Sequence, residues 1–248
     1  MPLLPVVSIF FGRWTTDSHS PSVQTMRYFH AFVFLGLGCC SSMLVGQTPP
    51  TSKAGQCSLV LLNALPGPQN LHVKFGAEDI WSPGFTPGQS TGGVLFPSGK
   101  KSVEMLCAGF APSKEEVFLP PGGNFAMVFF PGEAIKDGPD KGKKKIALFC
   151  PPPILPDRPP QGKNWHILLA GPLAQARLSV NAKMVDLKLG QPTTPDAGGG
   201  RFLLENGKNT LLGASPEGDG DYWVVVFGDS SESLQAVLLN HVAYAVPR

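Results

Sequence analysis

The chain has 248 residues, which is enough for one large domain or for two domains of ordinary size, each with its own core. A hydrophobic content of 42% argues against a disordered chain, and a net charge of +2 lacks the basic footprint of a nucleic-acid-binding protein. The 29 glycines and 26 prolines suit many short strands joined by tight turns, because Gly supplies positive φ and Pro fixes φ near turn values.

The N-terminal part of the chain has the layout of a secretory signal. Residues 26–47 begin with a methionine and a basic residue, continue with an apolar run and end in small residues. The apolar run is too short to span a bilayer as a helix. Because a signal normally begins a chain, we interpret Met26 as the true start and residues 1–25 as a non-native extension. The remainder would then be exported to the periplasm, cell envelope or extracellular space, with residues 48–56 as a polar tether.

A cysteine inside this signal raises a second possibility. Cys39 follows Gly38, so the mature N-terminus could be a lipid-anchored cysteine, which would be the protein's only link to a membrane. Cleavage by an ordinary signal peptidase after Ser42 or Gly46 is the alternative. The sequence leaves both routes open.

Three cysteines remain in the mature chain, at positions 57, 107 and 150. An exported protein can form a disulfide. Cys57 and Cys150 lie at the start of the first and near the end of the last expected strand of the first domain, so these two could pair. Buried free thiols fit the sequence equally well, since cysteine is among the most buried residue types.

Self-similarity between the two halves is the most informative feature of the sequence. Three apolar blocks recur at a constant offset of 107: residues 60–62, 71–73 and 92–96 correspond to 167–169, 178–180 and 199–203. Two later blocks, 125–130 and 146–149, correspond to 222–227 and 236–239 at smaller offsets. Ser98-Gly99-Lys100 and Asn206-Gly207-Lys208 both lie between apolar runs, as hairpin turns do. The sequence therefore predicts two copies of one domain.

A proline-rich stretch separates these copies. Residues 151–164 contain six prolines, favour an extended polyproline conformation and cannot pair into a sheet. We therefore expect an all-β protein made of two tandem immunoglobulin-like or Greek-key β-sandwich domains, 57–150 and 165–248, joined by this linker.

Short strands are expected throughout both copies. In the first copy they are residues 57–63, 70–76, 92–97, 101–107, 125–130 and 145–150; in the second they are 165–170, 177–182, 200–205, 208–213, 221–227 and 234–246. The alternation of Leu71, Val73 and Phe75 with polar residues indicates a strand with one face in a core. The runs FAMVFF (125–130) and YWVVVF (222–227) are apolar throughout, which predicts central strands covered on both faces.

No motif for catalysis, metal binding or cofactor binding is present. The histidines after the signal, at positions 72, 166 and 241, have no cysteine or carboxylate at metal-ligand spacing. The sequence around Lys141 has the wrong spacing for a phosphate loop, and no serine lies in a nucleophile elbow. We therefore expect no cofactor and no enzymatic activity. Trp81, in the loop IWSPGF with Phe85, is the best candidate for an exposed ligand contact.

Four motifs of the first copy resemble the bacterial domain of unknown function 4397. They are residues 61–67 (LLNALPG), 71–73 (LHV), 96–100 (FPSGK) and 123–128 (GNFAMV). The resemblance implies an exported or lipid-anchored β-sandwich protein that often occurs in tandem. It implies no functional residues, because the family has no assigned activity.

The expected function is a non-enzymatic binding or structural module, secreted or in the cell envelope, whose partner is a protein or glycan at the cell surface. The alternative is a carbohydrate-binding accessory protein that uses Trp81 and its neighbours. A third possibility is an enzyme whose site is assembled across the two copies. No nucleic-acid partner is expected.

Overall fold

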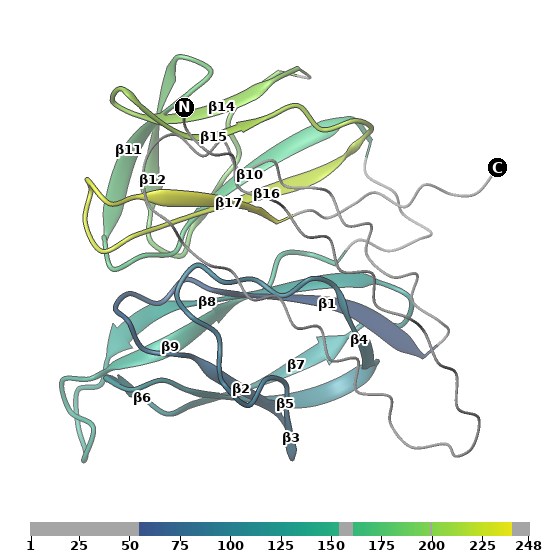
Figure 1. Cartoon of the computed structure of the whole chain (residues 1–248), viewed down its shortest axis with the longest axis vertical. Helices are drawn as coiled ribbons and strands as arrows, with labels where there is room; N and C mark the ends of the chain where they lie inside the picture. The colour runs from purple at the N-terminus through teal and green to yellow at the C-terminus, as the bar shows by residue number, and fades with distance from the viewer. Residues whose placement is uncertain (1–54, 154–160, 199, 240–248) are drawn as a thin grey trace, which may run out of the picture. The chain divides into compact units, whose positions relative to one another are not determined.

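The computed structural model describes residues 55–153, 161–198 and 200–239. Every described residue belongs to one compact unit, Val45–Arg248. These residues form strands, turns and loops without any helix, so the protein is all-β, as expected (Figure 1). The expected extension, signal and lipid-anchor cysteine Cys39 lie outside the described residues.

Two sheets build the first half. Inner sheet 1 has the order β4-β1-β8-β9-β6, with β4 at Val94–Pro97, β1 at Gln56–Asn63, β8 at Asn124–Ala134, β9 at Lys144–Phe149 and β6 at Phe110–Ala111. Outer sheet 1 has the order β3-β2-β5-β7, with β3 at Glu78–Asp79, β2 at His72–Phe75, β5 at Gly99–Leu106 and β7 at Ser113–Leu119.

Two further sheets build the second half. Inner sheet 2 has the order β13-β10-β16-β17, with β13 at Pro192–Thr193, β10 at Lys163–Leu169, β16 at Gly220–Phe227 and β17 at Gln235–Leu239. Outer sheet 2 has the order β12-β11-β14-β15, with β12 at Lys183–Lys188, β11 at Gln175–Val180, β14 at Phe202–Asn206 and β15 at Asn209–Ala214.

Each half encloses a core between its inner and outer sheets. In the first half, Leu61 and Phe129 of the inner sheet pack with Met105 of the outer sheet. In the second half, Trp165 of β10 stacks on Phe202 of β14 with ring centroids 4.1 Å apart. Alternation along the strands produces this arrangement, because it turns one set of side chains towards the facing sheet.

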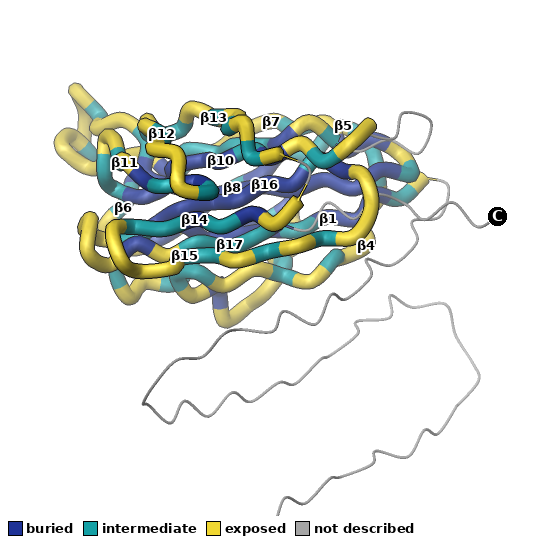
Figure 2. Tube along the Cα trace, turned by 90° about the horizontal axis from the view of Figure 1, so that it is seen from above, coloured by how far each residue is buried: buried dark blue, intermediate teal, exposed yellow. Residues whose placement is uncertain are grey.

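A third core lies between the two inner sheets, and we call it the seam. Its buried residues are Leu62, Ala64, Ala126, Val128, Phe130, Leu168, Ala170, Trp223, Val225, Phe227 and Leu239. The seam explains the two uninterrupted apolar runs: β8 and β16 are covered on both faces, so the prediction for residues 125–130 and 222–227 is confirmed. Figure 2 shows both strands as buried, between exposed outer segments.

Several expected strands differ from those observed. Residues 113–119 form β7 and residues 183–188 form β12, although the sequence predicts no strand in either range. Ser98-Gly99 is not a hairpin turn, because it connects β4 in inner sheet 1 to β5 in outer sheet 1. The match of 92–96 with 199–203 is therefore wrong: β4 pairs with β1, whereas β14 pairs with β11.

The linker is shorter than expected. β10 begins at Lys163, inside the range assigned to the proline-rich segment, because Lys163 and Asn164 pair with Gly220 and Asp221 of β16. Pro151, Pro152 and Pro153 form no strand, as their missing amide donors require. Residues 154–160 of this segment lie outside the described residues.

Candidate ligand groove in the first half

An open groove of about 500 Å³ lies at one end of outer sheet 1. Among its lining residues are Gln69, Asn70, His72, Leu106, Cys107 and Phe110. Its volume falls within the range of small-molecule sites, about 300–1,000 Å³. Polar and apolar groups both line it, so an amphipathic ligand would fit its chemistry better than a purely apolar one.

The groove depends on the connection between β5 and β7. After Leu106 the chain leaves outer sheet 1, and β6 pairs instead with β9 of inner sheet 1, Phe110 opposite Lys144. The chain then returns to the outer sheet as β7. In the second half, β14 and β15 are joined directly by the turn at Gly207-Lys208. The detour through residues 107–112 thus distinguishes the first half from the second at this position.

A loop that carries Trp81 adjoins the groove. The Asn70 side-chain amide donates a hydrogen bond to the Pro83 carbonyl oxygen at 2.8 Å. Gly84 packs so closely that a Cβ there would lie 2.9 Å from Asn70 Cβ and 3.0 Å from His72 Cε1. Any larger residue at position 84 would therefore push the loop away from the groove.

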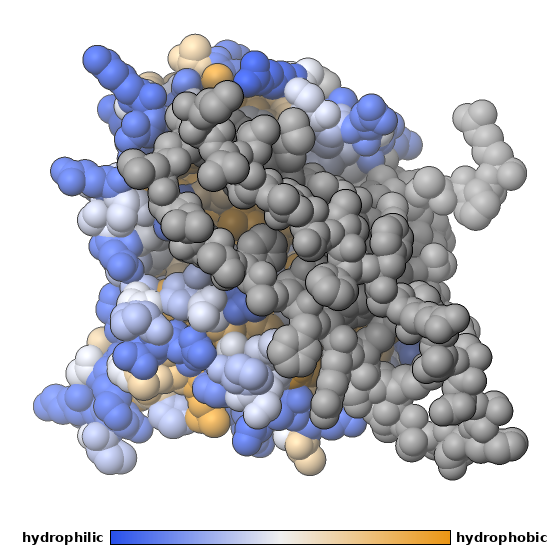
Figure 3. Space-filling view, viewed as in Figure 1, coloured by the Kyte–Doolittle hydropathy of each residue, from blue (hydrophilic) through white to orange (hydrophobic). Residues whose placement is uncertain are grey.

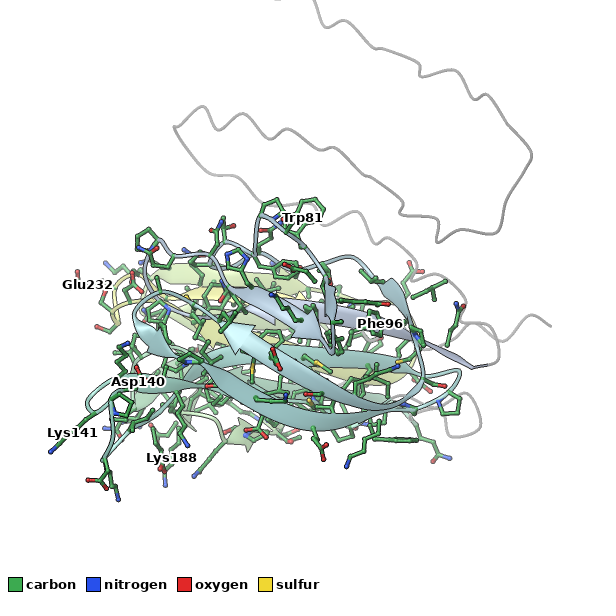
Figure 4. All side chains as sticks on the ribbon, turned by 90° about the horizontal axis from the view of Figure 1, so that it is seen from below. Trp81, Phe96, Asp140, Lys141, Lys188 and Glu232 are labelled. Carbon is green, nitrogen blue, oxygen red and sulfur yellow. The ribbon has the colours of Figure 1, made fainter. Side chains whose placement is uncertain are left out.

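Trp81 is 41% exposed, unusually accessible for a tryptophan. Its backbone N–H donates to Asp79 Oδ1 at 3.2 Å, and its carbonyl oxygen accepts from Gly84 N–H at 2.8 Å. Figure 4 shows the side chain at the surface of the loop. The exposure expected from the sequence is present, and the role of Trp81 in ligand contact stays a prediction.

Phe85, the second residue expected to contact ligand, lies inside the protein and not at its surface. The residue is only 3% exposed and belongs to the core of the first half. Its backbone exchanges two hydrogen bonds with Leu71, and its carbonyl oxygen also accepts from Asn63 Nδ2 at 2.7 Å. The ring is thus held inside by a short bridge that the sequence of the loop does not reveal.

Two polar side chains of the groove, His72 and Gln69, are free to bind a ligand. His72 lies opposite Leu106 across β2 and β5. Among the described residues, neither the His72 imidazole nor the Gln69 side-chain amide has a hydrogen-bond partner. The Cys107 thiol lies 3.9 Å from the Gln69 carbonyl oxygen, and burial raises its pKa. A protonated thiol is a weak nucleophile, so the groove is better suited to binding than to covalent chemistry.

A second polar cluster lies at the edge of the seam. His166 Nδ1 lies 2.9 Å from Thr194 Oγ1, and His166 Nε2 lies 3.7 Å from Asp221 Oδ1. Asn164 Nδ2 donates to the same carboxylate at 2.9 Å. The imidazole also stacks on Trp223 at 4.6 Å. The order of groups is carboxylate, imidazole, hydroxyl, but the carboxylate is beyond hydrogen-bond distance, so the cluster does not form a connected proton relay.

Sequence reasoning missed this cluster because its members lie far apart in the chain. The alternation of Asn164 and His166 with the buried Trp165 and Ile167 was a usable signal, since it places the two polar residues on the face opposite the core. Among the described residues, no group of three or more histidines, cysteines and acids lies close enough to hold a metal ion.

The three cysteines of the first half are free. Strand β8 lies between β1, which carries Cys57, and β9, which ends just before Cys150. Two strand spacings of about 4.8 Å separate these strands, more than the Cα distance of roughly 4.4–6.8 Å that a disulfide spans. The geometry therefore does not suit the expected Cys57–Cys150 bond. Burial raises the pKa of Cys57 to about 11 and that of Cys150 to about 12.

No protein-family model and no curated protein matches this chain. The described residues contain no helix long and apolar enough to cross a bilayer. Hydrophilic side chains cover much of the visible margin of the described region (Figure 3).

Proposed function

We propose that the chain is a non-enzymatic binding module of the exported or cell-envelope class, and that it takes its ligand in the groove of the first half. The observation that carries this proposal is the combination of unpaired polar groups in the groove, His72 and Gln69, with the exposed Trp81 on a loop pinned beside it. Four stacked sheets supply a stiff support, and a groove on a stiff support loses little conformational entropy on binding.

The two halves, in this proposal, are copies of one sandwich unit. The strand orders support it: β4-β1-β8-β9 corresponds to β13-β10-β16-β17, and β3-β2-β5-β7 corresponds to β12-β11-β14-β15. In both inner sheets the central pair is parallel, β1 with β8 and β10 with β16. An immunoglobulin-like topology, the relation to domain 4397 and export itself are parts of the proposal that rest on the sequence.

Hydrogen–deuterium exchange tests the groove directly. The protein is incubated with a panel of soluble cell-surface fragments, namely oligosaccharides, muropeptides and short peptides, and its amide exchange is compared with that of the free protein. We expect at least one fragment to protect residues 68–72 and 106–112, and mass spectrometry to recover that fragment unchanged. Protection confined to other segments would contradict the groove, and conversion of the fragment would contradict the non-enzymatic assignment.

Carbohydrate binding is the second candidate, and the exposed Trp81 ring favours it, because sugar rings stack on accessible aromatic faces. The test is a glycan array with Trp81→Ala beside a matched control, Phe118→Ala. Phe118 is 63% exposed on β7, at the end of outer sheet 1 away from the groove. We expect Trp81→Ala to lower glycan signal at least tenfold and Phe118→Ala to leave it unchanged. Equal loss in both variants, or none in either, rejects this candidate.

A further inference from the structure

The seam joins corresponding faces of the two halves, and strand register shows which residues correspond. Leu62 of β1 lies opposite Val128 of β8, and Leu168 of β10 lies opposite Val225 of β16. Since Val128 and Val225 occupy the same place in the apolar runs, Leu62 corresponds to Leu168. The offset for these strands is therefore 106, one less than sequence comparison indicates. Because successive side chains of a strand point to opposite faces, only the offset of 106 pairs residues that face the seam in both halves.

Four pairs of equivalent residues then meet in the seam. They are Leu62 with Leu168, Ala64 with Ala170, Val128 with Val225, and Phe130 with Phe227. Both members of every pair are buried there. The two inner sheets therefore contribute equivalent faces to the seam.

The contacts across the seam are reciprocal. A Cβ at Gly190 would lie 3.2 Å from Phe130 Cε2, and a Cβ at Gly88 would lie 3.2 Å from Phe227 Cε2. Each phenylalanine ring therefore packs against a glycine of the opposite half.

These two glycines also occupy equivalent places. Gly88 N–H donates to the Asn63 carbonyl oxygen at 2.7 Å, and Gly190 N–H donates to the Leu169 carbonyl oxygen at 2.9 Å. At the offset of 106, Asn63 and Leu169 correspond. Phe130 of the first half therefore contacts Gly190 of the second, and their equivalents, Phe227 and Gly88, contact each other in the same way. In a two-fold symmetric dimer, every contact is repeated in this manner.

We propose that the seam is a two-fold-like interface inside one chain, and that the partner its faces fit is the complementary half of a second copy of this chain. Hydrophobic contact through alternate residues of β8 (126, 128 and 130) and β16 (223, 225 and 227) holds the halves together, and the linker is not required for it. Two chains with open seams can consequently exchange halves, as domain-swapped dimers do.

One part of the seam departs from symmetry and supplies a test. Trp223 packs on Phe149 with ring centroids 5.4 Å apart. Trp223 in the second half corresponds to Ala126 in the first. Phe149 lies opposite Val128, and Val237 lies opposite Val225. Because Val128 and Val225 correspond, Phe149 corresponds to Val237. One end of the symmetric pattern therefore holds two large side chains, and the other holds two small ones.

The first experiment cuts the linker. A protease site replaces residues 154–160 in the full chain, and the cleaved protein is studied by size exclusion and native mass spectrometry at micromolar concentration. We expect both fragments to remain in one complex. Mixing isotope-labelled with unlabelled cleaved protein should then give hybrid complexes. Fragments that separate, or complexes that never form hybrids after gentle warming, would overturn the proposal.

The second experiment mirrors the seam in the uncut chain. Trp223→Ala alone should lower the Tm by roughly 10 °C, because it removes a large buried side chain. The fourfold variant Ala126→Trp, Phe149→Val, Trp223→Ala and Val237→Phe moves the large pair to the equivalent place. We expect it to recover at least half of the lost Tm. A variant less stable than Trp223→Ala would show that the two ends are not equivalent, and the two-fold relation would be wrong.

Discussion

Asn63 connects the core of the first half to the groove. It is 1% exposed, yet both ends of its side chain are satisfied. Its Nδ2 donates to the Phe85 carbonyl oxygen at 2.7 Å, and its Oδ1 accepts from Leu65 N–H at 3.0 Å. These bonds fix the start of the segment that leads to the groove. A buried asparagine is stable in this position only because both of its polar groups are paired.

Removing this side chain should be costly. Asn63→Ala leaves the buried Leu65 N–H without a partner and the Phe85 carbonyl oxygen with only its bond from Leu71 N–H. We expect a loss of roughly 1–3 kcal/mol of unfolding free energy. Urea denaturation measures it. The control is Asn70→Ala, which removes a bond at an exposed site and should cost less than about 1 kcal/mol. Similar losses in the two variants would contradict the role assigned to Asn63.

The buried thiol of Cys57 makes stability depend on alkaline pH. Burial raises its folded-state pKa to about 11, above the ordinary value of 9.0. The unfolded state therefore loses its proton first as pH rises. The stabilising contribution is fully present below about pH 9 and is lost as pH rises towards the folded pKa.

The measurement is the Tm at pH 8 and at pH 10.5, for the wild type and for Cys57→Ala. We expect the wild type to lose more stability than the variant between these two pH values, because only the wild type carries this thiol. Cys150→Ala is a second comparison with the same expected sign, since its pKa is also raised. Parallel pH curves for wild type and both variants would show that these thiols do not couple to folding.

The turn between β11 and β12 shows how a strand pair tolerates local strain. Val180 pairs with Lys183, so the turn has two central residues, Asn181 and Ala182. Both have positive φ, 47° and 64°. Asparagine adopts this conformation readily, and Asn181 also makes side-chain bonds to the carbonyl oxygens of Ala197 and Arg201. Alanine has no such compensation.

Ala182→Gly should therefore stabilise the protein by about 1 kcal/mol, because glycine adopts positive φ without steric cost. Thermal unfolding checks the sign. The matched control is Ala174→Gly, an exposed alanine outside the positive-φ residues. There the same substitution should lower stability slightly, through the entropy of the unfolded chain. A decrease in both variants would refute the strain argument.

Sequence patterns predicted some elements well and others poorly, for identifiable reasons. β8 and β16 were predictable because strands buried on both faces are apolar at every position. β7 was missed because it is an edge strand whose exposed charges, among them Lys114 and Glu116, resemble a loop. Those charges pair across the strands: Lys114 Nζ lies 2.8 Å from Glu104 Oε1 and lowers the pKa of that carboxyl.

The candidate site was harder to predict than the fold. Exposure of Trp81 followed from its loop, but the groove depends on a detour through β6 that pairs only two residues. The sequence around Phe110 carries no signal for a parallel pair with β9. Likewise, the parallel pairing of β1 with β8 joins segments more than sixty positions apart. Local alternation determines which side of a strand is buried, but it does not determine the neighbouring strand.

For the molecule as a whole, the seam links the stability of the two halves. Phe130 and Phe227 are nearly fully buried there, although they belong to different halves. Unfolding of either half would expose the apolar face of the other. We therefore expect residues 55–239 to unfold as one cooperative unit rather than as two independent sandwiches.

Differential scanning calorimetry tests this expectation. The protein should give one transition whose calorimetric and van't Hoff enthalpies agree. Phe227→Ala should lower that single transition by roughly 10 °C without splitting it. Its control, Phe118→Ala on the exposed face of β7, should leave the Tm nearly unchanged. Two resolved transitions in the wild type would show that the seam does not couple the halves.

The parallel pairs β1–β8 and β10–β16 place the starts of these strands at one end of each inner sheet and their ends at the other. The chain enters β1 at Gln56 and ends β17 at Leu239, which lies opposite Trp223 near the start of β16. Phe227, the last residue of β16, packs against Gly88, which is bonded to Asn63, the last residue of β1. The ends of β1 and β16 therefore lie together, and the two strands run in the same direction. The groove adjoins the far end, because Phe85, bonded to Asn63, bridges to Leu71 beside His72.

The eight residues of β1 separate this end from the chain's point of entry by roughly 25 Å. Anything that held the chain through the residues before β1 would therefore present Trp81 and the groove on the side facing away from the attachment. A ligand could then reach the groove without passing the anchoring surface. The length of β1 would set the distance between the groove and that surface.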